Sequence, residues 1–210
     1  LGGNNMSELD ELLDNNQVKK TVKWEEDGKE LSREITLQEP DARTASRILG
    51  TMTHGDNVMH FGDAMEIIMA NDVIVNPKYN YKMLNEKLTK EDTKKSVELT
   101  NRDCKKVTLY MNFPDYRTAF DLAMYMQHTD GTVDLTGMID RLIASRVIVD
   151  GNNKTLNWDW FDDRKKGYGL MGAVVQESIT FLMETLGKDG VFATLLEGFQ
   201  LATEQVSATR

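Results

Sequence analysis

Apolar residues recur along most of the chain at the spacing of amphipathic helices, and short stretches of alternating apolar and polar residues interrupt them. Alternation at 21–24 and 34–37 on either side of the turn signal Asp27-Gly28 predicts a β-hairpin. Helical spacing predicts six helices, at 40–52, 63–69, 114–126, 135–143, 170–187 and 191–206. The pattern therefore predicts a fold that is mainly α with short β-hairpins, in the α+β class.

One offset of 74 residues (114 − 40) relates two parts of this pattern. The motif Pro40-Asp41-Ala42-Arg43-Thr44-Ala45 recurs as Pro114-Asp115-Tyr116-Arg117-Thr118-Ala119, and Val73-Ile74-Val75 recurs as Val147-Ile148-Val149. From 40 to 76, 12 of the 37 positions are identical without a gap. Ile35-Thr36-Leu37 also matches Val107-Thr108-Leu109 if a two-residue shift is allowed. We interpret the chain as two tandem copies of one module, followed by two C-terminal helices.

The pattern also suggests how the chain is divided. Residues 1–20 are polar and are predicted to form a flexible segment, with a short helix at 7–13. Residues 21–85 form the first module. Residues 86–106 are rich in both charges and poor in large apolar side chains, which predicts a solvated helix and linker. Residues 107–210 form the second module and carry the C-terminal helices, the first of which we expect to end at a Gly187 cap.

Composition narrows the classes of partner. The chain has 210 residues, 40% of them hydrophobic, and a net charge of -9, so it repels nucleic acid and anionic membranes at long range. No apolar run reaches the roughly 20 residues of a membrane span. The first residues lack the pattern of a signal peptide, and one cysteine permits no intramolecular disulfide. We expect a cytoplasmic protein without a nucleic-acid or membrane partner.

Residues that could carry chemistry do not form a known catalytic pattern. His54, Asp56 and His60 have a spacing that fits no closed metal site. The segment 130–134 resembles the start of a calcium loop, but position 12 of that loop is Arg141 rather than glutamate. Glycine-rich phosphate loops and hydrolase motifs are absent from the sequence. The sequence therefore predicts no enzyme, no catalytic or metal-binding residue and no cofactor.

An aromatic run beside basic residues is the one motif typical of nucleic-acid binding. Trp158-Asp159-Trp160-Phe161 precedes Arg164-Lys165-Lys166, and such residues can stack on bases. The interleaved aspartates Asp159, Asp162 and Asp163 argue against this function, and a packed junction is the favoured interpretation. Cys104 beside two lysines is interpreted as an incidental free thiol in the linker.

Methionine is the unusual residue, with 12 in the chain. Its side chain is soft and adaptable, and adaptable binding surfaces use it often. Most of these methionines are expected in the core, and some are expected on an exposed apolar surface. We predict that partner-binding residues are among Met59, Met124, Met126, Phe192 and Phe199.

The segment Val73-Ile74-Val75-Asn76-Pro77 ends a predicted helical pair, and Ile148-Val149-Asp150 leads to Leu156-Asn157-Trp158-Asp159-Trp160-Phe161 before a helix. This plan resembles the tail assembly chaperones of phages that infect Gram-positive bacteria. The resemblance implies a non-enzymatic chaperone that oligomerises and binds the helical tape measure protein in the cytoplasm of the bacterial host. The duplication departs from that family. A structural virion or scaffold component is the alternative.

Overall fold

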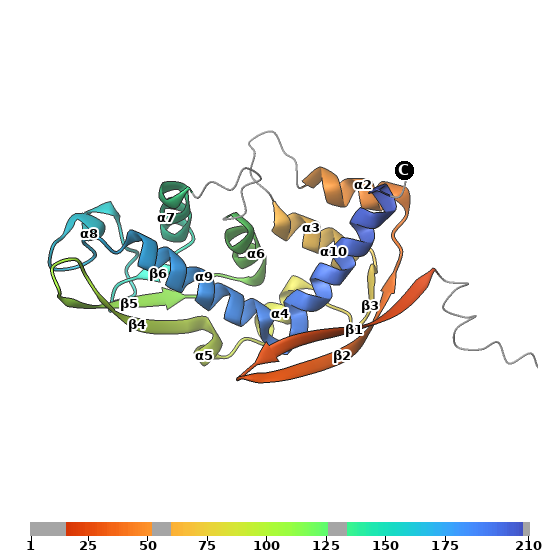
Figure 1. Cartoon of the computed structure of the whole chain (residues 1–210). Helices are drawn as coiled ribbons and strands as arrows, with labels where there is room; N and C mark the ends of the chain where they lie inside the picture. Colours follow the sequence, from red (N-terminus) through yellow and green to blue (C-terminus); the bar gives the residue numbers. More distant parts are fainter. Residues whose placement is uncertain (1–15, 52–59, 126–133, 208–210) are drawn as a thin grey trace, which may run out of the picture. The chain divides into compact units, whose positions relative to one another are not determined.

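The computed structural model describes residues 16–51, 60–125 and 134–207, and these divide into two compact units. Unit 1 contains residues up to Met83 together with those from Gly187 onward, and unit 2 contains Leu84–Leu186. Each unit combines a three-stranded antiparallel sheet with helices (Figure 1). The fold is therefore of the expected α+β class.

The elements follow one another along the chain. Those of unit 1 are β1 (Gln17–Glu26), β2 (Lys29–Gln38), α2 (Ala42–Thr51), α3 (Phe61–Ala70), β3 (Ile74–Asn76), the short helix η1 (Lys188–Gly190) and α10 (Val191–Ser207). Helix α4 (Tyr81–Glu86) spans the boundary. Those of unit 2 are α5 (Lys90–Thr93), β4 (Lys94–Thr100), β5 (Lys106–Asn112), α6 (Tyr116–Tyr125), α7 (Leu135–Ala144), β6 (Ile148–Val149), α8 (Trp158–Asp162) and α9 (Met171–Gly187).

Unit 1 starts with the predicted hairpin, which is longer than its sequence signal. Strand β1 pairs with β2 from Gln17 opposite Gln38 to Glu26 opposite Lys29, and β3 pairs with the other edge of β2. The two-residue turn Asp27-Gly28 has φ values of 51° and 71°. Left-handed values at both positions match the right-handed twist of the flanking strands, which is why such a turn closes tightly.

The core of unit 1 lies between its sheet and helices α2, α3 and α10. Helix α10 packs on α2, α3 and β1. The rings of Phe61 and Phe199 lie 5.3 Å apart between their centroids, which joins α3 to α10. The fully buried large side chains of this unit are Phe61, Ile35, Leu37, Ile48, Met65, Ile68 and Ile74.

Unit 2 buries the face of α9 that its apolar spacing predicts. Leu170, just before the helix, and Val174, Phe181, Leu182 and Thr185 are all buried. Phe181 makes an edge contact with Phe113, which follows β5, at a centroid distance of 6.4 Å. The sheet of unit 2 has the order β4-β5-β6. The helical prediction for 170–187 is therefore confirmed.

An aspartate after a proline begins one helix in each unit. In unit 2, the Asp115 carboxylate accepts hydrogen bonds from the Thr118 backbone N–H and hydroxyl, both at 2.9 Å. In unit 1, the Asp41 carboxylate accepts one from the Thr44 N–H at 2.7 Å, and this bond holds its pKa below the usual 3.8. The stabilisation from the Asp41 cap is therefore complete above pH 3.8 and is lost as the pH falls through the lowered pKa.

Substitution of the cap in unit 2 has a defined expected effect. Asp115→Ala is expected to lower the free energy of unfolding by about 1 kcal/mol, because the first turn of α6 loses its side-chain acceptor. Asp115→Asn is the matched control, since asparagine caps helices about as well. Urea unfolding monitored by circular dichroism measures both. Equal losses for the two variants would show that the charge, rather than the cap, is what matters.

The predicted charged linker at 86–106 is wrong. It contains the end of α4, the short helix α5 and the whole of β4, which pairs with β5 along its length. The half-buried side chains Lys95, Val97 and Leu99 alternate with exposed ones. An edge strand needs apolar side chains on only one face. The charged side chains on the other face of β4 give the segment the composition of a linker, so composition alone does not predict the strand.

Two further sequence expectations are corrected. The C-terminal helices do not both belong with residues 107–186, because α10 packs in unit 1. Gly187 does not form a left-handed cap, since its φ is −75°; Asp189 and Gly190 carry the positive φ values, 53° and 65°. Residues 17–20, which were predicted to belong to a flexible segment at 1–20, form the start of β1. The helix predicted at 7–13 lies outside the described residues.

In the part of the chain that the structure describes, no helix has the length and apolar character needed to cross a membrane.

Candidate functional site

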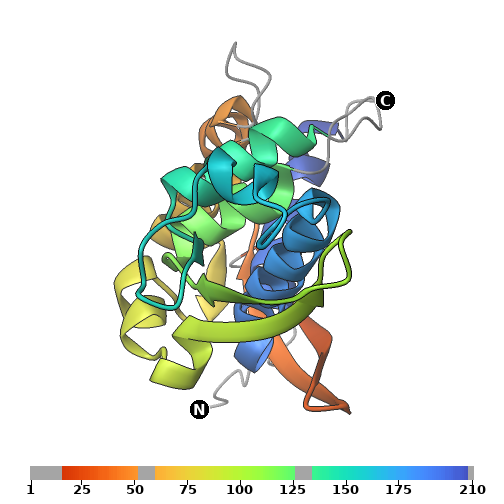
Figure 2. The ribbon, with the colours of Figure 1, turned by 90° about the vertical axis from the view of Figure 1, so that its left-hand side faces the viewer.

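Two turns of unit 2, far apart in the sequence, lie side by side at one end of its sheet. They are the β4–β5 turn together with the first residue of β5, 101–106, and the loop after α8, 163–168, and together they are called the basic tip. The Arg102 N–H donates to the Tyr168 carbonyl at 3.1 Å, which ties the turns together. Figure 1 shows the two turns beside α8, and Figure 2 turns this end toward the viewer.

A buried asparagine organises the basic tip. Asn101 is 3% exposed. Its Nδ2 donates to the carbonyls of Arg164 and Lys166 at 2.9 and 3.0 Å. Its Oδ1 accepts from the backbone N–H groups of Asp103 and Lys105, both at 3.0 Å. The Asn101 amide thus donates to one turn and accepts from the other. Asparagine is the only side chain of this size that carries both two N–H donors and a carbonyl acceptor.

The second turn packs against a buried indole. Trp160 is buried, and the Gly167 N–H donates to its carbonyl at 2.9 Å. A Cβ at Gly167 would lie 2.1 Å from two atoms of the Trp160 ring, so only glycine fits there. Asn157 caps the start of α8, and its side chain accepts from the Trp160 N–H. The aromatic run that suggested base stacking is thus largely a packed junction, since Phe161 is buried as well.

The basic tip concentrates positive charge in an acidic protein. Its residues include six cations and two carboxylates, Asp103 and Asp163, for a local charge of +6 − 2 = +4, against -9 for the whole chain. All six cationic side chains are exposed: Arg102, Lys105, Lys106, Arg164, Lys165 and Lys166. The neighbouring helix α8 adds two exposed carboxylates, Asp159 and Asp162. The positive charge is therefore confined to the two turns.

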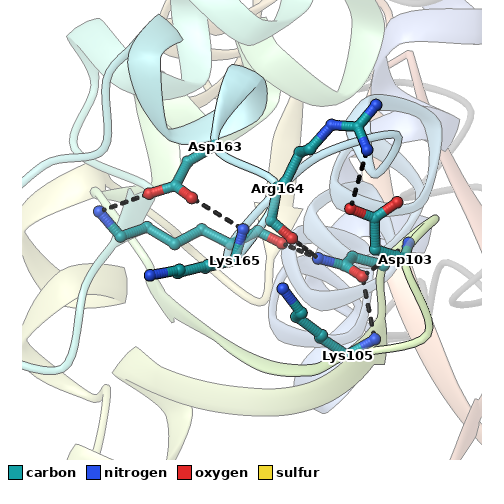
Figure 3. A network of polar contacts seen from close by, with 7 residues as sticks. Asp103, Lys105, Asp163, Arg164 and Lys165 are labelled. Carbon is teal, nitrogen blue, oxygen red and sulfur yellow. Dashed lines mark hydrogen bonds and ion pairs between the residues drawn. The ribbon is translucent and has the colours of Figure 1, made fainter.

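Three of the six cations are held by ion pairs. Figure 3 shows the Arg164 guanidinium directed at Asp103, 3.6 Å away. Lys166 pairs with Asp163 at 3.2 Å, and Lys106 pairs with Glu98 of β4 at 2.7 Å. Arg102, Lys105 and Lys165 have no ion pair to any residue within 16–51, 60–125 or 134–207. These three groups are available to an anionic ligand.

Hydrogen bonds shift the pKa values of two of the paired groups, Asp163 and Lys106. The Lys165 backbone N–H, followed by the Lys166 ammonium, holds the pKa of the Asp163 carboxyl below its usual value. The hydrogen bond to Glu98 raises the pKa of Lys106. Both groups are thus charged across the physiological range, and the ionised Asp163 carboxylate accepts from the Lys165 N–H and pairs with Lys166.

Two guanidinium groups cover the ring of Tyr168. The Cζ atoms of Arg102 and Arg164 lie over it, at 6.0 and 5.0 Å from the ring centroid. Cation–π contacts of this kind orient the guanidinium forks without neutralising them. The arrangement therefore presents two oriented guanidinium groups, one paired with Asp103 and one without an ion pair in the described ranges.

Sequence reasoning predicts no binding site at the basic tip. It singled out Arg164-Lys165-Lys166 but placed Cys104 and its neighbours in a linker. The structure places Cys104, exposed and at a φ of 58°, in the β4–β5 turn itself. The missing signal was the alternation of 94–100 and 106–112 around a short polar turn, which predicts a hairpin and so would have brought the basic residues together.

The predicted partner-binding residues are dispersed. Met59 and Met126 lie outside the described residues. Met124 in α6, and Phe192 and Phe199 in α10, are half-buried rather than exposed. The last two share one face of α10 with other partly exposed residues. We call this set the α10 stripe: Phe192, Leu196, Phe199, Thr203 and Val206.

The α10 stripe has spacings of four, three, four and three residues. Its first four members are half-buried and Val206 is 43% exposed. The parallel row Val191, Leu195, Gly198 and Ala202 is buried in unit 1. The helix thus uses one row for its own core and keeps a second row, apolar except for Thr203, partly open to solvent; within this second row the Phe199 ring also contacts Phe61 of α3.

Most of the residues considered as metal ligands lie outside the residues that the structure describes. His54 and Asp56 are among the residues not described, and so are residues 130–133 of the calcium-like segment, while Asp134 caps α7 and His60 immediately precedes α3. Within the described ranges, no group of three or more histidine, cysteine, aspartate or glutamate side chains is arranged to hold a metal ion.

Comparison with known proteins gives no match to the chain, whether to a family model, a curated protein or a solved structure.

Proposed function

We propose that the chain is a non-enzymatic assembly chaperone that covers apolar helical segments of a partner polypeptide. The observation that carries this proposal is the α10 stripe. Apolar positions that alternate by three and four residues form the seam by which one helix packs against another. A partner helix with the same spacing would fit such a row, as in the helix-in-groove mode of recognition.

The partial burial of the stripe suits a chaperone, which must release its partner. Full burial of a leucine, valine or phenylalanine side chain contributes roughly 1.5–3 kcal/mol, and these side chains are already half-buried. Covering each of them therefore adds only a part of that amount. The total free energy gained from covering the stripe is therefore modest, which favours reversible binding. While the partner is bound, its own apolar surface is shielded from water.

The resemblance to phage tail assembly chaperones indicates the kind of partner. On this proposal the partner is a tape measure protein, whose long helices are apolar until the tail tube covers them. The chaperone would act in the cytoplasm of the bacterial host and would form homo-oligomers. The alternative is a structural virion or scaffold component, which would use the same stripe for a permanent neighbour.

We further propose that the two units are tandem copies of one module with the order β-β-α-α-β. Backbone bonds at the offset of 74 residues support this. The Gln38 N–H donates to the Val73 carbonyl at 2.9 Å, and the Asn112 N–H donates to the Val147 carbonyl at 2.8 Å. Each module then acquires one long helix: α10 packs in unit 1 and α9 packs in unit 2.

On this proposal, strand pairing favours an alignment of the modules without a shift. Leu37 pairs with Ile74, and Met111 pairs with Ile148, which supports a match of Leu37 with Met111 at the same offset of 74. The sequence match of Leu37 with Leu109 requires a two-residue shift instead. Both matches place a buried residue opposite Leu37, because Leu109 and Met111 are both buried on the same face of β5.

The α10 stripe can be tested with a synthetic helical peptide that carries leucine and isoleucine in a heptad pattern. The double variant Thr203→Glu/Val206→Glu places two charges in the stripe and is expected to weaken binding of the peptide about tenfold or more. The control Gln176→Glu/Gln200→Glu adds the same charge at exposed positions outside it. Calorimetric titration measures both.

Two outcomes would count against the proposal: an unmodified chain that does not bind the heptad peptide, or equal binding by the stripe variant and its control. Analysis of the finished particle separates the chaperone from its alternative. A chaperone is absent from the particle after assembly, whereas a structural component is present in a fixed ratio to its neighbours.

A further inference from the structure

We propose that the basic tip is a docking point for an acidic polypeptide segment, in which aspartate or glutamate side chains pair with Arg102, Arg164 and Lys165. This deepens the proposed function, since it rests on the protein binding polypeptides, and it adds a second recognition element. The α10 stripe would take the apolar face of a partner, and the basic tip would take a carboxylate-rich stretch.

The tip is built before any ligand arrives. Asn101 joins the two turns through four side-chain hydrogen bonds, and Gly167 packs directly on the Trp160 ring. The cations therefore project from a fixed backbone rather than from independent loops. A fixed site loses less conformational entropy on binding, so even a few ion pairs yield net affinity.

The cations have the geometry that carboxylates need. The guanidinium groups of Arg102 and Arg164 are both held over Tyr168, which limits their rotation. An oriented guanidinium forms paired hydrogen bonds with a carboxylate, and these are stronger than contacts to a point charge. Asp103 already pairs with Arg164 at 3.6 Å, a long contact that a ligand carboxylate could replace or share.

A nucleic acid fits the tip less well than a peptide does. The Tyr168 ring, which would have to stack on a base, is covered by guanidinium groups. Single-stranded nucleic acid also follows an extended basic track, whereas the positive charge here spans two turns and borders the carboxylates of α8. The net charge of -9 repels a long polyanion, while a short acidic segment meets only the local +4.

The test uses the purified full chain and a fluorescent peptide of alternating glutamate and glycine, with anisotropy measured at low and at physiological salt. The variant Arg102→Gln/Arg164→Gln/Lys165→Gln is expected to weaken peptide binding about tenfold or more. The control Lys29→Gln/Lys87→Gln/Lys90→Gln removes the same charge from exposed lysines outside the tip. It is expected to change binding by less than about twofold.

A further variant separates the guanidinium fork from charge alone. Arg102→Lys/Arg164→Lys keeps the charge but lacks the fork, and it is expected to bind the peptide more weakly than the unmodified chain. Thermal unfolding shows whether each variant is folded. Because all three substituted side chains are exposed, the Gln variant is expected to unfold within a few degrees of the unmodified chain.

Three results would overturn the inference: no peptide binding by the unmodified chain, equal losses in the tip variant and its control, or tighter binding of oligothymidine than of peptide through the same residues. The heptad peptide serves as an independent readout in the same variants. If the tip variant still binds the heptad peptide, loss of the acidic peptide reports on the tip alone and the proposed function stands apart from it.

Discussion

Asn101→Asp is expected to lower the free energy of unfolding of unit 2 by about 3–5 kcal/mol, the range for a buried charge left without a partner. The side chain is 3% exposed and faces the carbonyls of Arg164 and Lys166 with its Nδ2. An aspartate would place a second anionic oxygen against those two carbonyl oxygens. The loss is expected to shrink in acid, because a protonated carboxyl regains one donor.

The matched control for this substitution is Asn152→Asp. Asn152 is exposed, and its backbone N–H rather than its side chain takes part in the turn at Asp150. Its substitution is expected to change stability by less than about 0.5 kcal/mol. Urea unfolding gives the free energies, and hydrogen exchange of residues 101–106 and 163–168 locates the effect. Similar losses in the two variants would show that Asn101 does not organise the tip.

Gly167→Ala is expected to destabilise unit 2 by roughly 1–3 kcal/mol through overpacking. The new Cβ would lie 2.1 Å from two atoms of the Trp160 ring, closer than any real contact. The indole is a rigid, buried group, so either the ring or the loop must move. The tryptophan emission spectrum is expected to shift as well, since the surroundings of Trp160 change. Urea unfolding and fluorescence measure the two effects.

Gly172→Ala, in the first turn of α9, is the control with the opposite expected sign. A Cβ there meets no atom within 4 Å. Alanine in a helix restricts the unfolded chain and favours the helical state, so a gain of up to about 1 kcal/mol is expected. If Gly167→Ala were also neutral or stabilising, the packing of the loop on Trp160 would not be a constraint, and the tip would not be a rigid site.

Local signals account for the parts of the fold that were predicted correctly. Asp27-Gly28 supports a left-handed two-residue turn without help from the rest of the chain, and a proline followed by aspartate begins α2 and α6. The buried face of α9 follows from its apolar period alone. These features depend on backbone conformation and on side chains within a few residues, so a single sequence contains enough information to predict them.

Features that join distant segments were missed or misplaced. The composition of β4 predicts a linker because its outer face is charged, and only its pairing with β5 shows that it is a strand. The basic tip is not predicted from the sequence, because 101–106 and 163–168 meet through Asn101 across more than 60 residues. A hydrogen bond of that kind leaves no periodic trace in the sequence.

By itself, the sequence determined the α+β class, the first hairpin, the helix starts and the buried face of α9, because turn chemistry and periodicity act over a few residues. Tertiary structure alone decided that α9 packs in unit 2 and α10 in unit 1. It also decided that the cations of two distant turns form one site. The physical reason is that both outcomes depend on contacts between segments far apart in the sequence. Helices α9 and α10 have similar apolar patterns, so the pattern does not predict which unit each helix packs in; that depends on which apolar surfaces are buried together in each core.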